Sequence, residues 1–173
     1  DYVAHGGLTG LKNALAMSGG DVVPAVTDSG LRGRGGAGFP AGIKWRTVAD
    51  QPPAPHAGES QNAPAHKYIC VNADEGDSGT FADRMLMEGD PFCLLEGMTI
   101  AAHAVAADRG LVYLRSEYPD AIATLQSAIW IAREQGWLGD NILGSDLCFD
   151  VEIRIGAGSY VCGDCLLYTS DAA

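Results

Sequence analysis

Short apolar runs alternate with longer helical segments over the second half of the chain, and this alternation restricts the fold most. Three runs have the length and composition of buried strands: residues 68–71, 111–114 and 151–155. Asp90-Pro91 and Pro119 open the two segments between them, because Asp caps helices and Pro suits their first turn. Gly110 and Gly136 are expected to follow the helix ends. Strands joined in this way predict an α/β fold with a parallel sheet covered by helices.

The first third of the chain predicts shorter elements. Apolar residues at helical spacing predict a helix over residues 8–17, ended by Gly19-Gly20, and a second helix over 22–28. A glycine-rich run follows at 30–42, and residues 51–65, with four prolines, predict a loop.

Composition excludes several classes of protein. With 22 acidic and 11 basic residues, the net charge is −11, so nucleic acid and anionic lipid are poor partners. No apolar run approaches the roughly 20 residues that cross a bilayer, and residues 1–10 contain no secretory signal. Five irregularly spaced cysteines do not form a disulfide framework, which favours a cytoplasmic location.

Residues 33–38 fit the pattern G-x-G-x-x-G, which alone is weakly specific. The Rossmann fingerprint requires a strand before it, whereas a helix or turn is predicted here, so we reject that interpretation. A loop remains whose bare N–H groups can approach phosphate, flanked by Arg32, Arg34 and Lys44. It predicts a nucleotide or phosphate site, with a plain mobile loop as the alternative. Phe39 is either a stacking residue or part of the core.

An acidic turn at residues 72–77 follows the first predicted strand, where parallel sheets collect ligands. Carboxylates there can accept hydrogen bonds from ribose hydroxyls or ring N–H groups. A calcium loop is a competing interpretation, but its twelfth position holds Asp83 instead of the expected Glu. A solvated acidic turn is the third possibility. A further glycine-rich turn, residues 156–163, follows the last strand and is expected to close over the same ligand.

The end of the chain predicts a foreign tail. Residues 165–173 resemble a translated transposon-end adapter from shotgun sequencing. The motif Cys162-Gly163-Asp164-Cys165 is then an accident, and we expect no metal site in this chain. We therefore expect one domain over residues 1–164, incomplete on its C-terminal side.

Several motifs in register resemble one family, the NADH-binding flavoprotein subunit of respiratory complex I. The diaphorase subunits of NAD-dependent formate dehydrogenases and NAD-reducing hydrogenases share them. The resemblance extends from about His5 to Asp164. The matching segments are 29–40, 42–45, 72–77, 81–84, 96–98, 115–118 and 156–163.

The resemblance implies a Rossmann-like FMN-binding domain on which NADH stacks. The flavin carries the chemistry, so no side chain is expected to be catalytic. FMN and the dinucleotide phosphates would contact Gly33, Arg34, Gly35, Gly36, Ala37, Gly38 and Lys44. Phe39 would pack on the NADH rings, and Asp77 would face the adenosine. The rest of the flavin site would comprise Asn72, Asp74, Glu75, Tyr160, Gly163 and Asp164.

The resemblance also implies partner subunits, and the sequence departs from the family pattern at some positions. Electrons would pass to iron–sulfur partner subunits through a [4Fe-4S] cluster in the missing C-terminal part, so the fragment alone is expected to be inactive. Any membrane association would run through those subunits. Asp164 replaces a family Glu, and Thr47 stands where some members have an aromatic residue. The sequence of residues 76–92 favours a formate dehydrogenase or hydrogenase diaphorase, with complex I as the alternative. A non-redox nucleotide-binding module is the alternative from another class.

Overall fold

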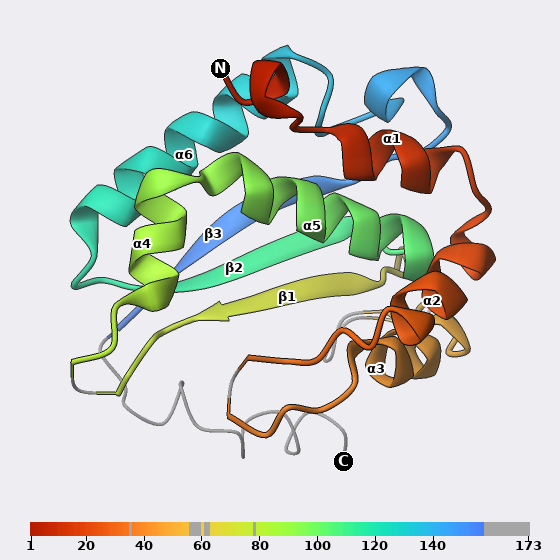
Figure 1. Cartoon of the computed structure of the whole chain (residues 1–173), viewed down its shortest axis with the longest axis horizontal. Coiled ribbons are helices and arrows are strands. Elements are labelled where there is room, and N and C mark those ends of the chain that lie inside the picture. Colours follow the sequence, from red (N-terminus) through yellow and green to blue (C-terminus); the bar gives the residue numbers. More distant parts are fainter. Residues whose placement is uncertain (35, 56–59, 61–62, 78, 158–173) are drawn as a thin grey trace.

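Three parallel strands form the centre of the molecule (Figure 1). The computed structural model describes residues 1–34, 36–55, 60, 63–77 and 79–157. The strands are β1 (Tyr68–Ala73), β2 (Arg109–Arg115) and β3 (Asp150–Gly156), arranged in the order β1-β2-β3. Tyr68 lies opposite Arg109, which in turn lies opposite Asp150. The predicted parallel α/β fold is confirmed, and each strand is two or three residues longer than its apolar run.

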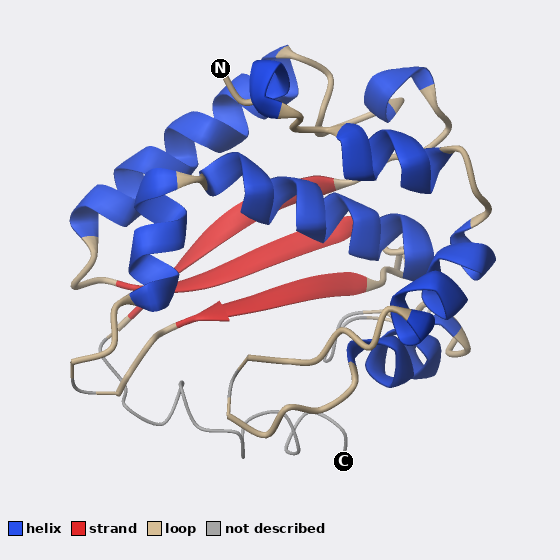
Figure 2. Cartoon of the chain, in the orientation of Figure 1, coloured by secondary structure: helices blue, strands red, loops and turns tan. Residues whose placement is uncertain are grey.

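Two long helices connect the strands: α5 (Pro91–Val105) and α6 (Pro119–Glu134). Both connections step the same way across the sheet, so right-handed crossovers place both helices on one face. Figure 2 shows both helices on one face of the sheet, and Val112 and Leu114 of the central strand are fully buried. The shorter helices are α1 (Thr9–Leu15), α2 (Gly19–Asp28), α3 (Ala41–Ala49) and α4 (Ala82–Gly89), with 3-10 turns η1 (Val3–His5) and η2 (Ile142–Gly144).

The local signals for the long helices are confirmed. Asp90 accepts a hydrogen bond from the Cys93 N–H at 3.3 Å, and Pro91 takes the first position of α5. α6 also begins at its proline, Pro119, and Gly136 lies just after its end with a φ of 67°. Both helix starts were visible because each depends on neighbours in the sequence.

The prediction that Gly19-Gly20 ends a helix was wrong, because these residues begin α2. Ser18 caps that helix and accepts the Asp21 N–H at 3.3 Å. Gly19 lies against α5, where a Cβ would meet the His103 carbonyl oxygen at 2.3 Å. Close packing of two helices therefore requires this glycine.

Gly110 was also misassigned, because α5 ends earlier and Gly110 lies inside β2. Ala106 adopts the left-handed conformation at the helix end, with a φ of 57°. A Cβ on Gly110 would approach the Phe149 ring at 2.7 Å and a Val151 methyl at 2.8 Å. The helices α3 and α4 were missed altogether.

A carboxylate distant in the sequence holds the start of α1. Its N-cap position is occupied by Leu8, which has no side-chain oxygen. Glu96 of α5 supplies that oxygen and accepts the Leu8 N–H at 2.8 Å, the Leu11 N–H at 2.9 Å and the Tyr2 hydroxyl. Burial raises the pKa of Glu96, but these hydrogen bonds outweigh it and lower the pKa below its usual value.

We expect Glu96→Gln to destabilise the fold by about 1–2 kcal/mol at pH 7, because the amide loses a charge-assisted acceptor. Because the pKa of Glu96 is lower in the folded state than in the unfolded state, its charge stabilises the fold at pH values above the unfolded pKa. This stabilisation is lost as the pH falls through the folded pKa. The difference between wild type and variant should therefore shrink below about pH 4.5. Urea unfolding across a pH series measures it, and a pH-independent difference would contradict the charge-based explanation.

Candidate functional site at the carboxyl end of the sheet

The turn after β1 is held by the elements around it. The Glu75 carboxylate accepts the Asp83 N–H at 3.0 Å and the Arg84 N–H at 3.3 Å, at the start of α4. The Tyr118 hydroxyl, just before α6, donates to the same carboxylate at 3.2 Å. Arg115, the last residue of β2, donates to the Glu75 carbonyl at 2.6 Å. The acidic turn is therefore tied to β2, α4 and α6.

Asp74 is the most buried carboxylate of the predicted site, with 4% of its surface exposed. Burial raises its pKa, and the nearby Arg115 opposes that shift. The Asp74 N–H donates to the Asn72 side-chain oxygen at 3.1 Å, which tightens the turn. Asp77, in contrast, is exposed.

The glycine loop between α2 and α3 is closed like a short hairpin. Arg32 bridges to Pro40, and the Gly33 N–H donates to the Phe39 carbonyl at 2.9 Å. Gly36 and Gly38 have φ values of 93° and 58°, a region that side chains disfavour. A Cβ on either glycine would meet no atom within 4 Å, so this backbone is open to a ligand. A helix precedes the loop, which confirms that it is not a Rossmann fingerprint.

The cations around this loop have different roles. Arg32 donates to the Gly38 carbonyl at 2.9 Å and so braces the loop from within. Arg34 is exposed. Lys44, in the first turn of α3, lies 5.7 Å from the centre of the Phe39 ring, which is 44% exposed. The structure thus brings together a cation and an aromatic face beside an open backbone, an arrangement suited to a nucleotide's phosphate and ring.

Some predicted residues fall outside the described part of the chain: Gly35, Tyr160, Gly163 and Asp164. Residues 158–163 of the expected closing turn and the tail at 165–173 lie there too. Arg115 and Tyr118 were not assigned to the site from the sequence. Their position at and just after the carboxyl end of the second strand was the signal that pointed to them.

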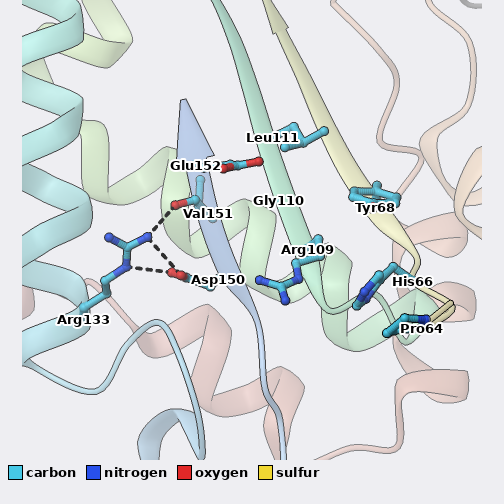
Figure 3. Close-up of a pocket in the computed structure, with 10 residues that line it drawn as sticks. All are labelled: Pro64, His66, Tyr68, Arg109, Gly110, Leu111, Arg133, Asp150, Val151 and Glu152. Carbon is cyan, nitrogen blue, oxygen red and sulfur yellow. Dashed lines mark hydrogen bonds and ion pairs between the residues drawn. The ribbon is translucent and has the colours of Figure 1, made fainter. Parts of the chain in front are cut away.

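A cavity of about 390 Å³ lies at the amino ends of the strands, away from the predicted site (Figure 3). Its ionic side chains are paired, some of them with residues outside its lining. Arg133 binds Asp150 at 2.8 and 2.9 Å and the Val151 carbonyl at 3.0 Å, and His66 pairs with Asp108. This cavity lacks a glycine-rich backbone, so it does not resemble a phosphate site.

Within residues 1–157, apart from the undescribed positions, no three His, Cys, Asp or Glu side chains are grouped as metal ligands. None of the helices described is long and apolar enough to cross a membrane.

Comparison with known proteins identifies relatives of the whole described region. The chain is 49% identical over 164 residues to the NADP-reducing hydrogenase subunit HndC of Solidesulfovibrio fructosivorans, covering 95% of this chain and 31% of that protein. It is 46% identical to an NADH-quinone oxidoreductase subunit of Rhizobium meliloti (strain 1021), covering 94% and 36%. For the corresponding NADH-quinone oxidoreductase subunit of Escherichia coli (strain K12) the values are 42%, 95% and 35%. The chain thus spans about a third of the length of the curated relatives it matches.

The chain also resembles solved structures of a hydrogenase in fold and sequence. The NAD+-reducing [NiFe]-hydrogenase in its H2-reduced state is 40% identical, with a TM-score of 0.66, covering 87% of this chain and 23% of that one. Its air-oxidized state gives a TM-score of 0.63 at 40% identity, covering 83% and 21%. The Nuo51 FMN-binding domain family matches residues 26–167. The resemblance inferred from the motifs is confirmed, and the chain belongs to the Nuo51 FMN-binding domain family.

Proposed function

We propose that this chain is the FMN- and NADH-binding part of an oxidoreductase flavoprotein subunit. The observation that carries the proposal is the open glycine loop at Gly36 and Gly38, with Lys44 and Phe39 beside it. A flat, phosphorylated cofactor matches this combination of bare backbone, cation and exposed ring. Bound FMN supplies hydride acceptance from NADH and one-electron release to iron–sulfur acceptors.

The protein's own residues bind and orient FMN and NADH. In this proposal the loop amides of residues 33–38, with Arg34 and Lys44, hold phosphate groups, and Phe39 packs on the NADH rings. Asn72, Asp74 and Glu75 form the flavin side of the pocket. A further part of that pocket, including Tyr160, Gly163 and Asp164, is assigned by the resemblance alone. In this arrangement the acidic turn, with its buried Asp74, supplies ribose- and ring-binding groups, and the cationic loop supplies phosphate-binding groups.

The proposed setting is a multi-subunit redox enzyme. The relatives are named as subunits of a hydrogenase and of NADH-quinone oxidoreductases. We infer iron–sulfur partner subunits, a [4Fe-4S] cluster in the remainder of the subunit, and a cytoplasmic location. A hydrogenase or formate dehydrogenase diaphorase remains the favoured assignment, supported by 49% identity to a hydrogenase subunit. A complex I subunit, supported by 46% identity, is the alternative.

Reduction by NADH tests the proposal directly. The full-length subunit, reconstituted with FMN, should lose its flavin absorbance anaerobically when NADH is added. FMN binding followed by no bleaching with either NADH or NADPH would instead support a nucleotide-binding module without redox chemistry. Failure to bind FMN at all would contradict the proposal.

We expect Asp77→Asn to shift coenzyme preference toward NADPH. In the proposed site this exposed carboxylate accepts hydrogen bonds from the adenosine ribose and repels a 2′-phosphate. The amide keeps the size and one acceptor but removes the charge. The NADPH-to-NADH ratio of kcat/KM values should rise roughly tenfold, about 1.4 kcal/mol.

Asp140→Asn is the matched control, because Asp140 is also exposed but follows α6, far along the chain from the turn. It should leave the ratio unchanged. The comparison is informative because one relative is named for NADP reduction. An unaltered ratio in Asp77→Asn would mean that this carboxylate only solvates its turn.

A further inference from the structure

Tyr118 occupies an unusual position between two guanidinium groups. Its ring centre lies 5.2 Å from Arg115 and 5.5 Å from Arg84. Each arginine is also fixed by a carboxylate on its own segment, Arg84 by Glu88 at 2.8 Å and Arg115 by Glu117 at 3.5 Å. Cation–π contacts of this kind orient an aromatic ring and restrict its rotamers.

The Tyr118 hydroxyl is directed by this arrangement onto Glu75. The hydroxyl donates to the Glu75 Oε2 atom at 3.2 Å, the same atom that accepts the Arg84 N–H. Burial and the neighbouring Glu75 charge both raise the pKa of Tyr118, so the phenol stays protonated and remains a donor at neutral pH. Tyr118 itself is half-buried.

Fixing Glu75 also fixes the rest of the acidic turn. Arg115 holds the Glu75 carbonyl at 2.6 Å, so both the main chain and the side chain of this residue are restrained. The buried Asp74 directly precedes it and Asn72 closes the same turn. A side chain at the start of α6 thus controls the conformation of a loop at the end of β1.

We propose that Tyr118 is a positioning residue that pre-orders the Asn72–Asp77 turn for the cofactor through its hydrogen bond to Glu75. The inference rests on the proposed function, since it assumes that this turn faces FMN. Tyr118 acts only through Glu75. Pre-ordering a binding loop lowers the conformational entropy lost on binding, so removing the hydroxyl costs affinity without removing a direct contact.

A double-mutant cycle on the full-length subunit tests the proposal. FMN affinity is measured by flavin fluorescence titration for wild type, Tyr118→Phe, Glu75→Ala and the double variant. Tyr118→Phe should weaken FMN binding roughly threefold to tenfold, the range for one hydrogen bond. In the Glu75→Ala background the same substitution should have no effect beyond twofold, because the acceptor of the Tyr118 hydroxyl is already removed.

Hydrogen exchange provides a readout independent of the cofactor. In the apo subunit, Tyr118→Phe should raise exchange at the Asp83 and Arg84 amides, which donate to Glu75. Tyr68→Phe, at the amino end of β1, is the control and should change neither exchange at these amides nor FMN affinity.

The outcomes separate the two proposals. A wild-type subunit that binds no FMN overturns the proposed function, and the positioning role with it. Normal FMN binding with an unchanged Tyr118→Phe affinity overturns the positioning role alone. Losses that multiply independently in the double variant overturn it as well, because Tyr118 would then act by a route other than Glu75.

Discussion

Replacing Lys44 with Ala should weaken FMN or NADH binding by about 1.5–3 kcal/mol in the full-length subunit, roughly 10- to 150-fold. Lys44 is exposed in the first turn of α3, beside the open backbone of Gly36 and Gly38. A phosphate on this backbone would gain a charge-assisted hydrogen bond from its ammonium group. Because the chain has a net charge of −11, the overall electrostatic field of the protein does not compensate for the loss of this cation.

The salt dependence of the affinity separates a phosphate contact from a packing effect. Lys44→Ala should reduce the dependence on ionic strength, because one charge interaction is lost. Lys12→Ala removes an equally exposed lysine from α1 and should leave the affinity unchanged. An affinity within twofold of wild type in Lys44→Ala would place Lys44 outside the site.

Gly19→Ala should lower the free energy of unfolding by about 3 kcal/mol, at the upper end for overpacking. Its Cβ would lie 2.3 Å from the His103 carbonyl oxygen, a backbone atom of α5 that cannot rotate away. α2 would have to move off α5, and Val22 and Val23, both in the core, would lose contacts. Urea unfolding of this chain measures the change.

Gly20→Ala is a closely matched control, one residue further along the same helix. The nearest atom to its Cβ is the Ser18 Oγ at 3.7 Å, an ordinary contact. This variant should be neutral or stabilised by up to about 1 kcal/mol, because alanine restricts the unfolded chain and favours helix. Equal effects at the two glycines would mean that α2 and α5 do not pack closely.

The glycines show which structural roles could be predicted from the sequence and which could not. Gly136 was placed correctly, since a glycine after a helix end is a local signal. Gly19 and Gly110 were misread because the same residue type also marks close packing between distant segments. Nothing near Gly19 in the sequence indicates His103, which lies 84 residues away.

In the candidate site, too, some features could be predicted from the sequence and others could not. The glycine loop and the acidic turn were predicted from residue types and their position after predicted elements. Arg32 was grouped with the phosphate-binding cations, yet the structure shows it bracing the loop through the Gly38 carbonyl. Glu75 was assigned to the flavin, while the structure shows its carboxylate accepting hydrogen bonds from α4 and Tyr118. Such roles depend on partners that only the folded chain supplies.

The sequence by itself determined the parallel α/β fold, the starts of the two long helices and the family. Those features depend on periodicity, on caps made by neighbouring residues and on motifs in fixed order. Only the tertiary structure decided how α1 is capped and how the acidic turn is held. Glu96 caps a helix 85 residues earlier in the chain, and Tyr118 reaches a carboxylate 43 residues away. The physical reason is that a polar group must find a partner on folding, and a partner distant in sequence leaves no local pattern.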